Sequence, residues 1–185
     1  PALDEDDLLL VCTKNRTEHL LADLARHELD AVLVDEPVGP QYHVKAYNHL
    51  LLESRIGVYG RPELVKKFGL GFPKNLDGAP FLMTAERSAL RRELDRSFLS
   101  AAVVPKVVAE FDDTALMRVF GEQGKGLFAY PEVMEERLGA MYGLARAGIL
   151  EDTKERFFLV TLERKVRDPT VLKLRAHYQN TGEHQ

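Results

Sequence analysis

The sequence predicts an α/β fold of two lobes, and the order of its apolar runs carries that prediction. Leu8–Thr13 and Ala31–Val34 are short continuous apolar runs that indicate buried strands, and leucines at helical spacing lie between them. Two strands joined by a helix form a βαβ unit, which predicts parallel pairing. The same alternation of apolar strand-like runs and helical spacing returns from Phe81 onward. We expect the middle of the chain to form one lobe and its two ends to form the other.

Each element is predicted from a local signal. Apolar runs bounded by Gly, Pro, Asn or Asp indicate strands at Leu8–Thr13, Ala31–Val34, Tyr47–Leu52, Ile56–Tyr59, Phe81–Met83, Lys106–Glu110, Leu127–Ala129, Tyr142–Ile149 and Arg156–Leu162. Apolar faces behind cap residues indicate helices at Asn15–His27, Arg61–Phe68, Ser88–Ala101, Asp113–Phe120 and Pro131–Leu138, with a last one opened by Asp168-Pro169. Asn15 with Glu18 is expected to be an N-cap and its partner.

Composition limits the classes of function. The chain has 185 residues, of which 45% are apolar, so a hydrophobic core is expected. Its net charge of −4, without a dominant Lys/Arg block, argues against direct nucleic-acid binding by these residues. The single cysteine, Cys12, excludes an internal disulfide and is expected to be a small buried hydrophobe. No apolar stretch approaches the roughly 20 residues of a membrane span, and the acidic start lacks an initiator Met, so we expect the chain to begin inside a larger protein.

Four passages of the chain carry a family resemblance, and they are Thr17–Leu24, Leu29–Pro37, Arg87–Arg92 and Glu110–Met117. In this order they resemble the effector-binding domain of LysR-type transcription regulators. The last two are closest to the NhaR-like branch, whose namesake activates sodium/proton antiporter genes. The resemblance implies a two-lobed fold like that of type-2 periplasmic binding proteins, with an effector cleft. Its first lobe is expected to be incomplete at the N-terminus, because Leu8–Thr13 matches the family's second strand.

The resemblance also implies the domain organisation and the partners. Residues 1–53 with 159–185 would form regulatory lobe I and residues 54–158 regulatory lobe II, with crossovers near Glu53–Ile56 and Phe157–Leu159. The domain would sense a small molecule or an ion and control DNA binding by an absent winged helix-turn-helix. The protein would be a cytoplasmic homodimer or tetramer with no membrane partner, in which Thr17–His27 packs against Ser88–Ala101 of another subunit. The alternative is a periplasmic-type solute-binding protein of the same fold.

Candidate ligand-binding residues follow the predicted strands, because ligands of α/β sheets bind at the carboxyl ends of strands beside helix N-termini. They are Thr13, Asn15, Asp35, Thr84, Arg87, Ser88, Asp112 and Asp113. Arg87 and Ser88 could bind an anion at a helix start. For five of them a plainer interpretation stands beside this one: Asp112 and Asp113 as helix caps, Arg87 as a solvated side chain, Ser88 as an ordinary helix-start serine, and Asp35 as part of a turn.

No cofactor is predicted, and the effector is not identified by the sequence. Because hard cations take carboxylate oxygens, Asp112 and Asp113 could contribute to a cation site, and the NhaR-like resemblance suggests sodium. No firm metal site is predicted, since the six histidines show no metal-ligand spacing. Nor does the sequence assemble a nucleophile, a base and an oxyanion donor, so we expect no enzyme activity.

Overall fold

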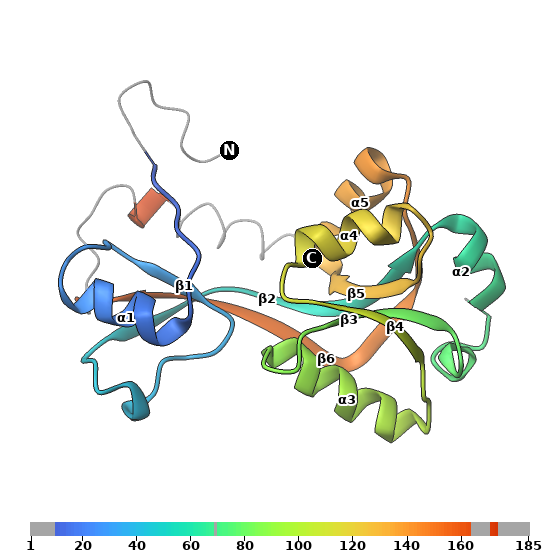
Figure 1. Ribbon diagram of the computed structural model, residues 1–185, viewed down its shortest axis with the longest axis horizontal. Coiled ribbons are helices and arrows are strands. Elements are labelled where there is room, and N and C mark those ends of the chain that lie inside the picture. The colour runs from blue at the N-terminus through green and yellow to red at the C-terminus, as the bar shows by residue number, and fades with distance from the viewer. Residues whose placement is uncertain (1–9, 69, 164–170, 174–185) are drawn as a thin grey trace. The chain divides into compact units, whose positions relative to one another are not determined.

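The computed structural model describes residues 10–68, 70–163 and 171–173, and these fall into two compact units. The first unit contains the described residues up to Glu53 and those from Arg156 onward. The second unit is Ser54–Glu155. Two long strands, β2 (Tyr47–Gly60) and β6 (Ala145–Thr161), run from one unit into the other (Figure 1).

The strands form a mixed sheet in the order β1-β6-β2-β5-β3-β4. The four shorter strands are β1 (Val32–Val34), β3 (Pro80–Thr84), β4 (Lys106–Phe111) and β5 (Leu127–Pro131). In the second unit, β3 lies parallel to both β4 and β5, whereas β2 pairs with β5 in the antiparallel sense. The carboxyl ends of β3, β4 and β5 therefore share one edge of the sheet with the Ser54–Ile56 stretch of β2.

Between Thr17 and Tyr142, the described residues form five α-helices that accompany the sheet. They are α1 (Thr17–Ala25), α2 (Pro62–Phe68), α3 (Ala89–Ala101), α4 (Thr114–Glu122) and α5 (Glu135–Tyr142), with 3-10 turns at Pro40–Tyr42, Lys74–Leu76 and Glu132–Met134. The longest of them has 13 residues. None of the described helices has the length and apolar character needed to cross a membrane.

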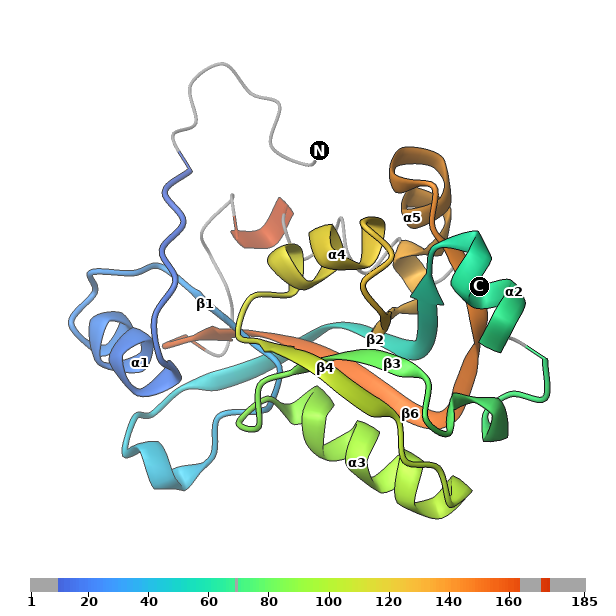
Figure 2. The same ribbon diagram turned by 45° about the vertical axis from the view of Figure 1, so that its right-hand side comes forward.

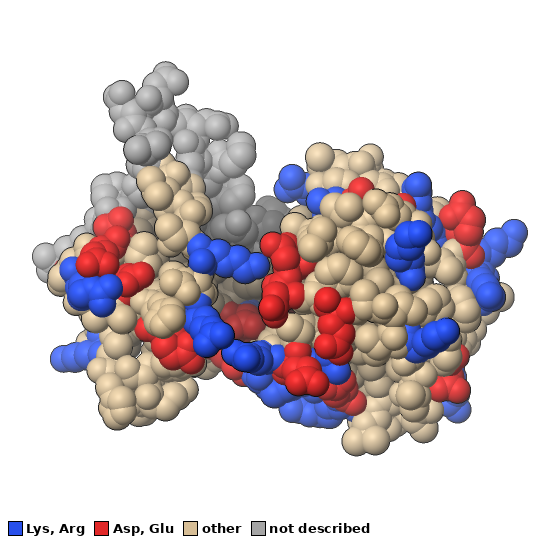
Figure 3. All heavy atoms as spheres, viewed as in Figure 1, with Lys and Arg blue, Asp and Glu red and all other residues tan. Residues whose placement is uncertain are grey.

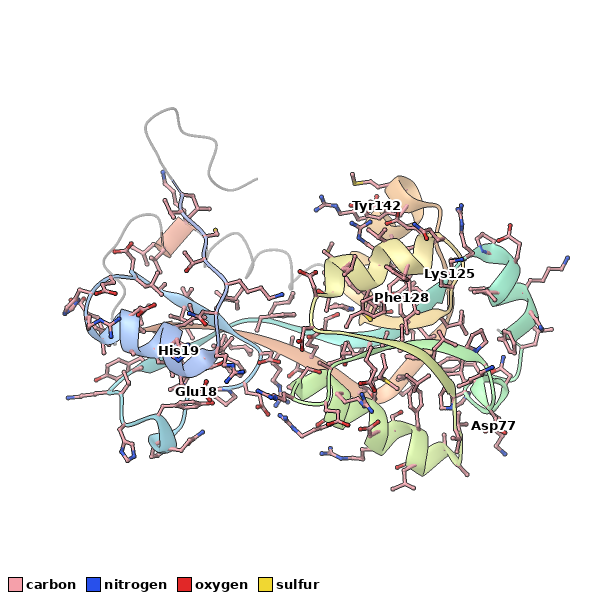
Figure 4. The ribbon with its side chains drawn as sticks, in the orientation of Figure 1. Glu18, His19, Asp77, Lys125, Phe128 and Tyr142 are labelled. Carbon is pink, nitrogen blue, oxygen red and sulfur yellow. The ribbon has the colours of Figure 1, made fainter. Side chains whose placement is uncertain are left out.

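Helices cover both faces of the sheet in the second unit. On one face, α3 buries Leu90, Leu94 and Phe98 in a cluster with strand residues such as Phe81. On the other face, Met117 of α4 and Leu138 of α5 pack with residues of β2, β3 and β5. Figure 2 shows α3 and α4 on opposite sides of β3 and β4. In Figure 4, Phe128 of β5 lies beneath α4, as its membership of the second cluster requires.

The first unit has its own small core. Leu21 and Leu24 of α1 pack against Val32, Val34 and Val160, all of which are buried. The labelled polar residues Glu18 and His19 lie on the same helix (Figure 4). Alternation places Leu33 of β1 on the opposite side of the strand, where it is exposed. The α1 helix thus covers one face of the β1–β6 pair.

The start of the chain differs from the sequence-based prediction. Residues 10–13 form no strand, and Leu10 and Val11 are exposed, while Leu8 and Leu9 lie outside the described residues. Cys12 is exposed rather than buried. An apolar run becomes a strand only when a neighbour takes its backbone hydrogen bonds, and no described strand pairs with this run. The expected parallel βαβ unit is therefore wrong here, because β1 pairs with β6 in the antiparallel sense.

Other differences concern boundaries and caps. The two strands expected at Tyr47–Leu52 and Ile56–Tyr59 are one strand, β2, and the two expected late strands are one strand, β6. The N-cap of α1 is Arg16, not Asn15, whose side chain instead accepts a hydrogen bond from the Arg16 N–H. The expected helix start at Asp168-Pro169 lies outside the described residues.

Candidate functional site

The carboxyl edge of the second unit brings two of the predicted loops together. Thr84, the last residue of β3, is aligned with Phe111, the last residue of β4. One residue further, the Ala85 N–H donates to the Phe111 carbonyl over 2.9 Å. The loop from Ala85 to Ser88 and the Asp112-Asp113 pair therefore lie beside each other. The N-termini of α3 and α4 flank this edge from the two faces of the sheet (Figures 1 and 2).

Ser88 and Thr84 are the less exposed of the predicted residues at this edge. Ser88 is the N-cap of α3, and its hydroxyl oxygen accepts from the Arg91 N–H over 3.0 Å. The same hydroxyl donates to Thr84 Oγ1, also over 3.0 Å. Thr84 is buried, with 3% of its surface exposed. Both predicted residues are thus held in fixed positions, with Ser88 nearer to solvent.

Arg91 of α3 contacts the ends of β3 and β4, and it is not among the residues predicted from the sequence. Its Nη1 donates to the Thr84 carbonyl and to Glu110 Oε1, each over 3.0 Å, and its Nε donates to Asp95. Burial lowers its pKa, but the carboxylates of Glu110 and Asp95 outweigh burial, so the pKa lies above the ordinary value. The Arg91–Asp95 spacing of four residues on a helix was the available sequence signal. This guanidinium ties the ends of β3 and β4 to α3.

The two acidic residues have different roles. Asp113 is the N-cap of α4, where its Oδ1 accepts from the N–H groups of Ala115 and Leu116 over 2.8 and 3.1 Å. This is the capping interpretation of the sequence analysis. Asp112 is exposed on the same loop, and so is Arg87 on the neighbouring one. Among the described residues, no group of three His, Cys, Asp or Glu side chains is arranged to hold a metal ion.

A second cluster at this edge was missed by the sequence analysis. Arg55 of β2 binds Glu132 through a fork, with Nε and Nη2 donating to the two carboxylate oxygens over 2.8 and 3.0 Å. Buried Ser54 accepts from the Val133 N–H over 3.2 Å. The pKa of Tyr130, at the end of β5, is raised mainly by burial. Nothing in the sequence indicates these contacts, because β2 and β5 are separated by more than half the second unit.

The predicted residues of the first unit are only partly brought together. Asp35 lines a cavity of about 220 Å³ with Thr17, Glu36, Gln41 and Tyr42, beside the end of β1 and the start of α1. Asn15 Oδ1 lies 3.2 Å from His19 Nδ1 at the start of α1. Thr13 is exposed in a stretch without regular structure. Asp35 therefore lines a cavity, whereas Thr13 is not among the residues that line it.

The described residues form an α/β domain of two units, and comparison with known proteins gives its family. The model of the LysR substrate binding domain matches residues 7–182. The chain belongs to this family.

Relatives agree with this assignment. The chain is 25% identical over 172 residues to the transcriptional activator protein NhaR of Escherichia coli K12, and the match covers 93% of this chain and 56% of NhaR. The chain thus spans little more than half the length of this curated relative.

Solved structures show the same fold. The effector binding domain of QuiR in complex with shikimate has a TM-score of 0.65 at 15% identity, covering 91% of this chain and 79% of that one. The regulatory domain of CcmR from Synechocystis PCC6803, in complex with 2-PG, has a TM-score of 0.62 at 20% identity, covering 88% and 80%. The expected fold, two-lobed and of the type found in LysR effector domains, is confirmed.

Proposed function

We propose that this chain is the effector-sensing regulatory domain of a bacterial LysR-family transcription factor. The family match over residues 7–182 is the observation that carries the proposal. DNA binding would reside in a winged helix-turn-helix outside this sequence, since NhaR is a transcriptional activator of which the chain covers only 56%. The family match favours a regulator over a solute-binding protein of the same fold. The two compact units would be lobes I and II of the regulatory domain.

The proposed effector site uses the carboxyl edge of the second unit. Thr84 and Ser88 would orient the ligand, and Arg87, Asp112 and Asp113 would border it. In the first unit, Asp35 would contact a ligand in the cavity beside Thr17, with Asn15 and Thr13 less central. No catalytic residue is proposed, because recognition requires only positioned donors and acceptors.

The proposed effector is a small organic anion rather than sodium. The N-termini of α3 and α4 flank the site, and their helix dipoles favour negative charge there. Asp113 already uses Oδ1 to cap α4, which leaves it less suited to a cation site. In Figure 3, acidic and basic side chains are interspersed over the visible face, and no broad basic surface is seen on that face. This arrangement supports sensing, with DNA contacts made elsewhere in the protein.

A ligand screen on the full-length protein tests this function. Small carboxylates, phosphorylated acids, and sodium against potassium chloride would be compared by thermal denaturation. A specific effector at 100 times its Kd should stabilise the fold by about 2.7 kcal/mol. We expect an anion to raise the melting temperature and Arg87→Ala to reduce that shift. A shift produced by sodium alone, and lost in Asp112→Asn, would support the cation interpretation instead.

We further propose that the protein acts as a cytoplasmic homodimer or tetramer through α1 and α3. Exposed apolar side chains lie at the end of α3, in the loop after it and along β4, namely Leu99, Val104, Val107 and Val108. Such clusters on a surface indicate protein interfaces. Light scattering should give a multiple of the chain mass for the wild type and a monomer for Leu99→Glu. Leu70→Glu, which changes another exposed leucine, is the matched control.

A further inference from the structure

The second unit contains a cavity that is separate from the proposed effector site. Its volume is about 290 Å³, close to the lower end of the roughly 300–1,000 Å³ found for small-molecule pockets. Ser97 and Ser100 of α3 line one side, and Asp152 and Thr153 of β6 line another. These α3 residues lie in the half of the helix away from its cap, Ser88, which belongs to the carboxyl edge. The cavity lies wholly within one unit.

Thr153 gives the cavity an unmet hydrogen-bonding group. This residue is buried to 1% exposure, and its Oγ1 has no hydrogen-bond partner among the described residues. Buried hydroxyl groups normally find a partner, because leaving one unpaired after desolvation is unfavourable. An isolated threonine in a strand could have been replaced by valine without change of shape. Thr153 also lines the cavity, so an occupant of the cavity is the available partner for this hydroxyl.

The charges around the cavity favour a cation. Three carboxylates line it, those of Glu93, Glu151 and Asp152, against one guanidinium, that of Arg96. Arg96 already pairs with Glu93 over 3.1 Å. Glu151 contacts Arg55 over 3.4 Å while its side chain stays 72% exposed. Asp152 has no ion pair within the part of the chain that the structure describes.

We infer that this cavity binds a small aliphatic amine. The ammonium group would lie beside Asp152 and Glu151, and hydroxyl groups of the two serines and Thr153 would take its remaining hydrogen bonds. The apolar wall, which includes Ile149 and Leu150, would contact the carbon chain. At about 30 Å³ for each water-sized volume, the cavity has room for a ligand of up to ten non-hydrogen atoms.

Calorimetric titration of the whole chain with 1,4-diaminobutane tests the inference. We expect one saturable site with a Kd near or below the millimolar range at low salt. Succinate, an anion of the same carbon length, should not bind there. Asp152→Asn should weaken diaminobutane binding by about tenfold. Glu63→Gln, which removes an exposed carboxylate of α2 outside the cavity, should leave binding unchanged.

Three results would overturn the inference. They are the absence of saturable binding by the wild type, binding unaffected by Asp152→Asn, and equal weakening by Asp152→Asn and Glu63→Gln, which would indicate general charge attraction. Thr153→Val separates binding from folding. We expect it to weaken binding without lowering the melting temperature of the ligand-free chain. A lowered melting temperature with unchanged binding would show that the hydroxyl serves the fold alone. None of these readouts depends on the effector site.

Discussion

Ser88 Oγ lies 3.0 Å from Thr84 Oγ1 and 3.0 Å from the Arg91 nitrogen, so one hydroxyl joins the end of β3 to the first turn of α3. The donor and acceptor functions of this hydroxyl are both used. A serine cap was expected from the sequence, but its bond to the buried threonine was not. The relationship places the predicted binding loop on a rigid base.

Ser88→Ala removes both of these hydrogen bonds. We expect the free energy of unfolding to fall by about 1 kcal/mol, the usual cost of losing an N-cap. Ser88→Asp should recover most of the stability, because a carboxylate also accepts from the helix N–H, although it cannot donate to Thr84. Urea denaturation of the three proteins measures these differences. Equal stability of Ser88→Ala and the wild type would contradict the capping role.

A side chain at Gly57 would collide with the phenol ring of Tyr59, which occupies that space. A β-carbon on Gly57 would lie 2.5 Å from Tyr59 Oη and 2.6 Å from two ring carbons. Tyr59 is fully buried, so it has no room to move away. Gly57→Ala should therefore lower the free energy of unfolding by about 1–3 kcal/mol.

Gly139→Ala is the matched control for that substitution. The nearest atom to a β-carbon there is the Leu144 oxygen at 3.7 Å, which is ordinary contact. Gly139 lies within α5, where alanine is the better helix former by about 1 kcal/mol. We expect Gly139→Ala to be neutral or stabilising by thermal denaturation. Similar losses in both variants would show that the phenol does not set the cost at Gly57.

Because of the buried Tyr59, we expect the protein to lose stability at high pH. Burial raises its pKa above the ordinary value of 10.0, with the carboxylate of Glu135 adding to the effect. Below pH 10 the phenol is protonated in both the folded and the unfolded chain, so it causes no change of stability with pH there. Stability is lost as the pH rises above the unfolded pKa, because the unfolded chain releases the proton while the buried phenol keeps it. One such group changes the unfolding free energy by about 1.4 kcal/mol per pH unit in that range.

Tyr59→Phe should reduce this alkaline dependence. Near neutral pH the variant should be at least as stable as the wild type, because Tyr59 Oη has no hydrogen-bond partner among the described residues. Urea denaturation at several pH values from about 8 to 11 compares the slopes. An unchanged slope in Tyr59→Phe would assign the effect to other groups, among which Tyr130 also has a raised pKa.

Arg91→Lys keeps the positive charge at this position but removes the planar guanidinium with its several N–H donors. A lysine ammonium cannot reach the Thr84 carbonyl, Glu110 and Asp95 together, as the guanidinium does. We expect a loss of about 1–2 kcal/mol in the free energy of unfolding. Arg92→Lys, at the adjacent exposed position, should change stability little. If both variants lose the same stability, the contacts of Arg91 do not hold the edge together.

Sequence reasoning succeeded where local signals decide structure. The helix start at Ser88, the cap at Asp113 and the strand at Phe81–Met83 depend on residues close together in the chain, and the structure has each of them. The side-by-side position of the Thr84–Ser88 and Asp112-Asp113 loops followed from the parallel rule for strands. These successes concern local propensity and one topological rule.

The failures concern pairing across the chain. Whether Leu10–Thr13 forms a strand depends on a neighbour, and the length of β2 and β6 depends on mutual support along the sheet. The Arg55–Glu132 fork joins residues far apart in sequence. Periodicity contains no information on such partners. For the same reason Tyr59, an ordinary strand aromatic by pattern, gave no sign of its unpaired hydroxyl.

Hydrogen exchange on the full-length protein, with and without the anion that stabilises it most, tests the central claim most directly. The account predicts slower exchange of backbone amides in Ala85–Ala89 and Asp112–Leu116 when ligand is bound, and loss of that protection in Ser88→Ala. Protection confined to other segments, with these two loops unchanged, would contradict the claim that the carboxyl edge of the second unit binds the effector.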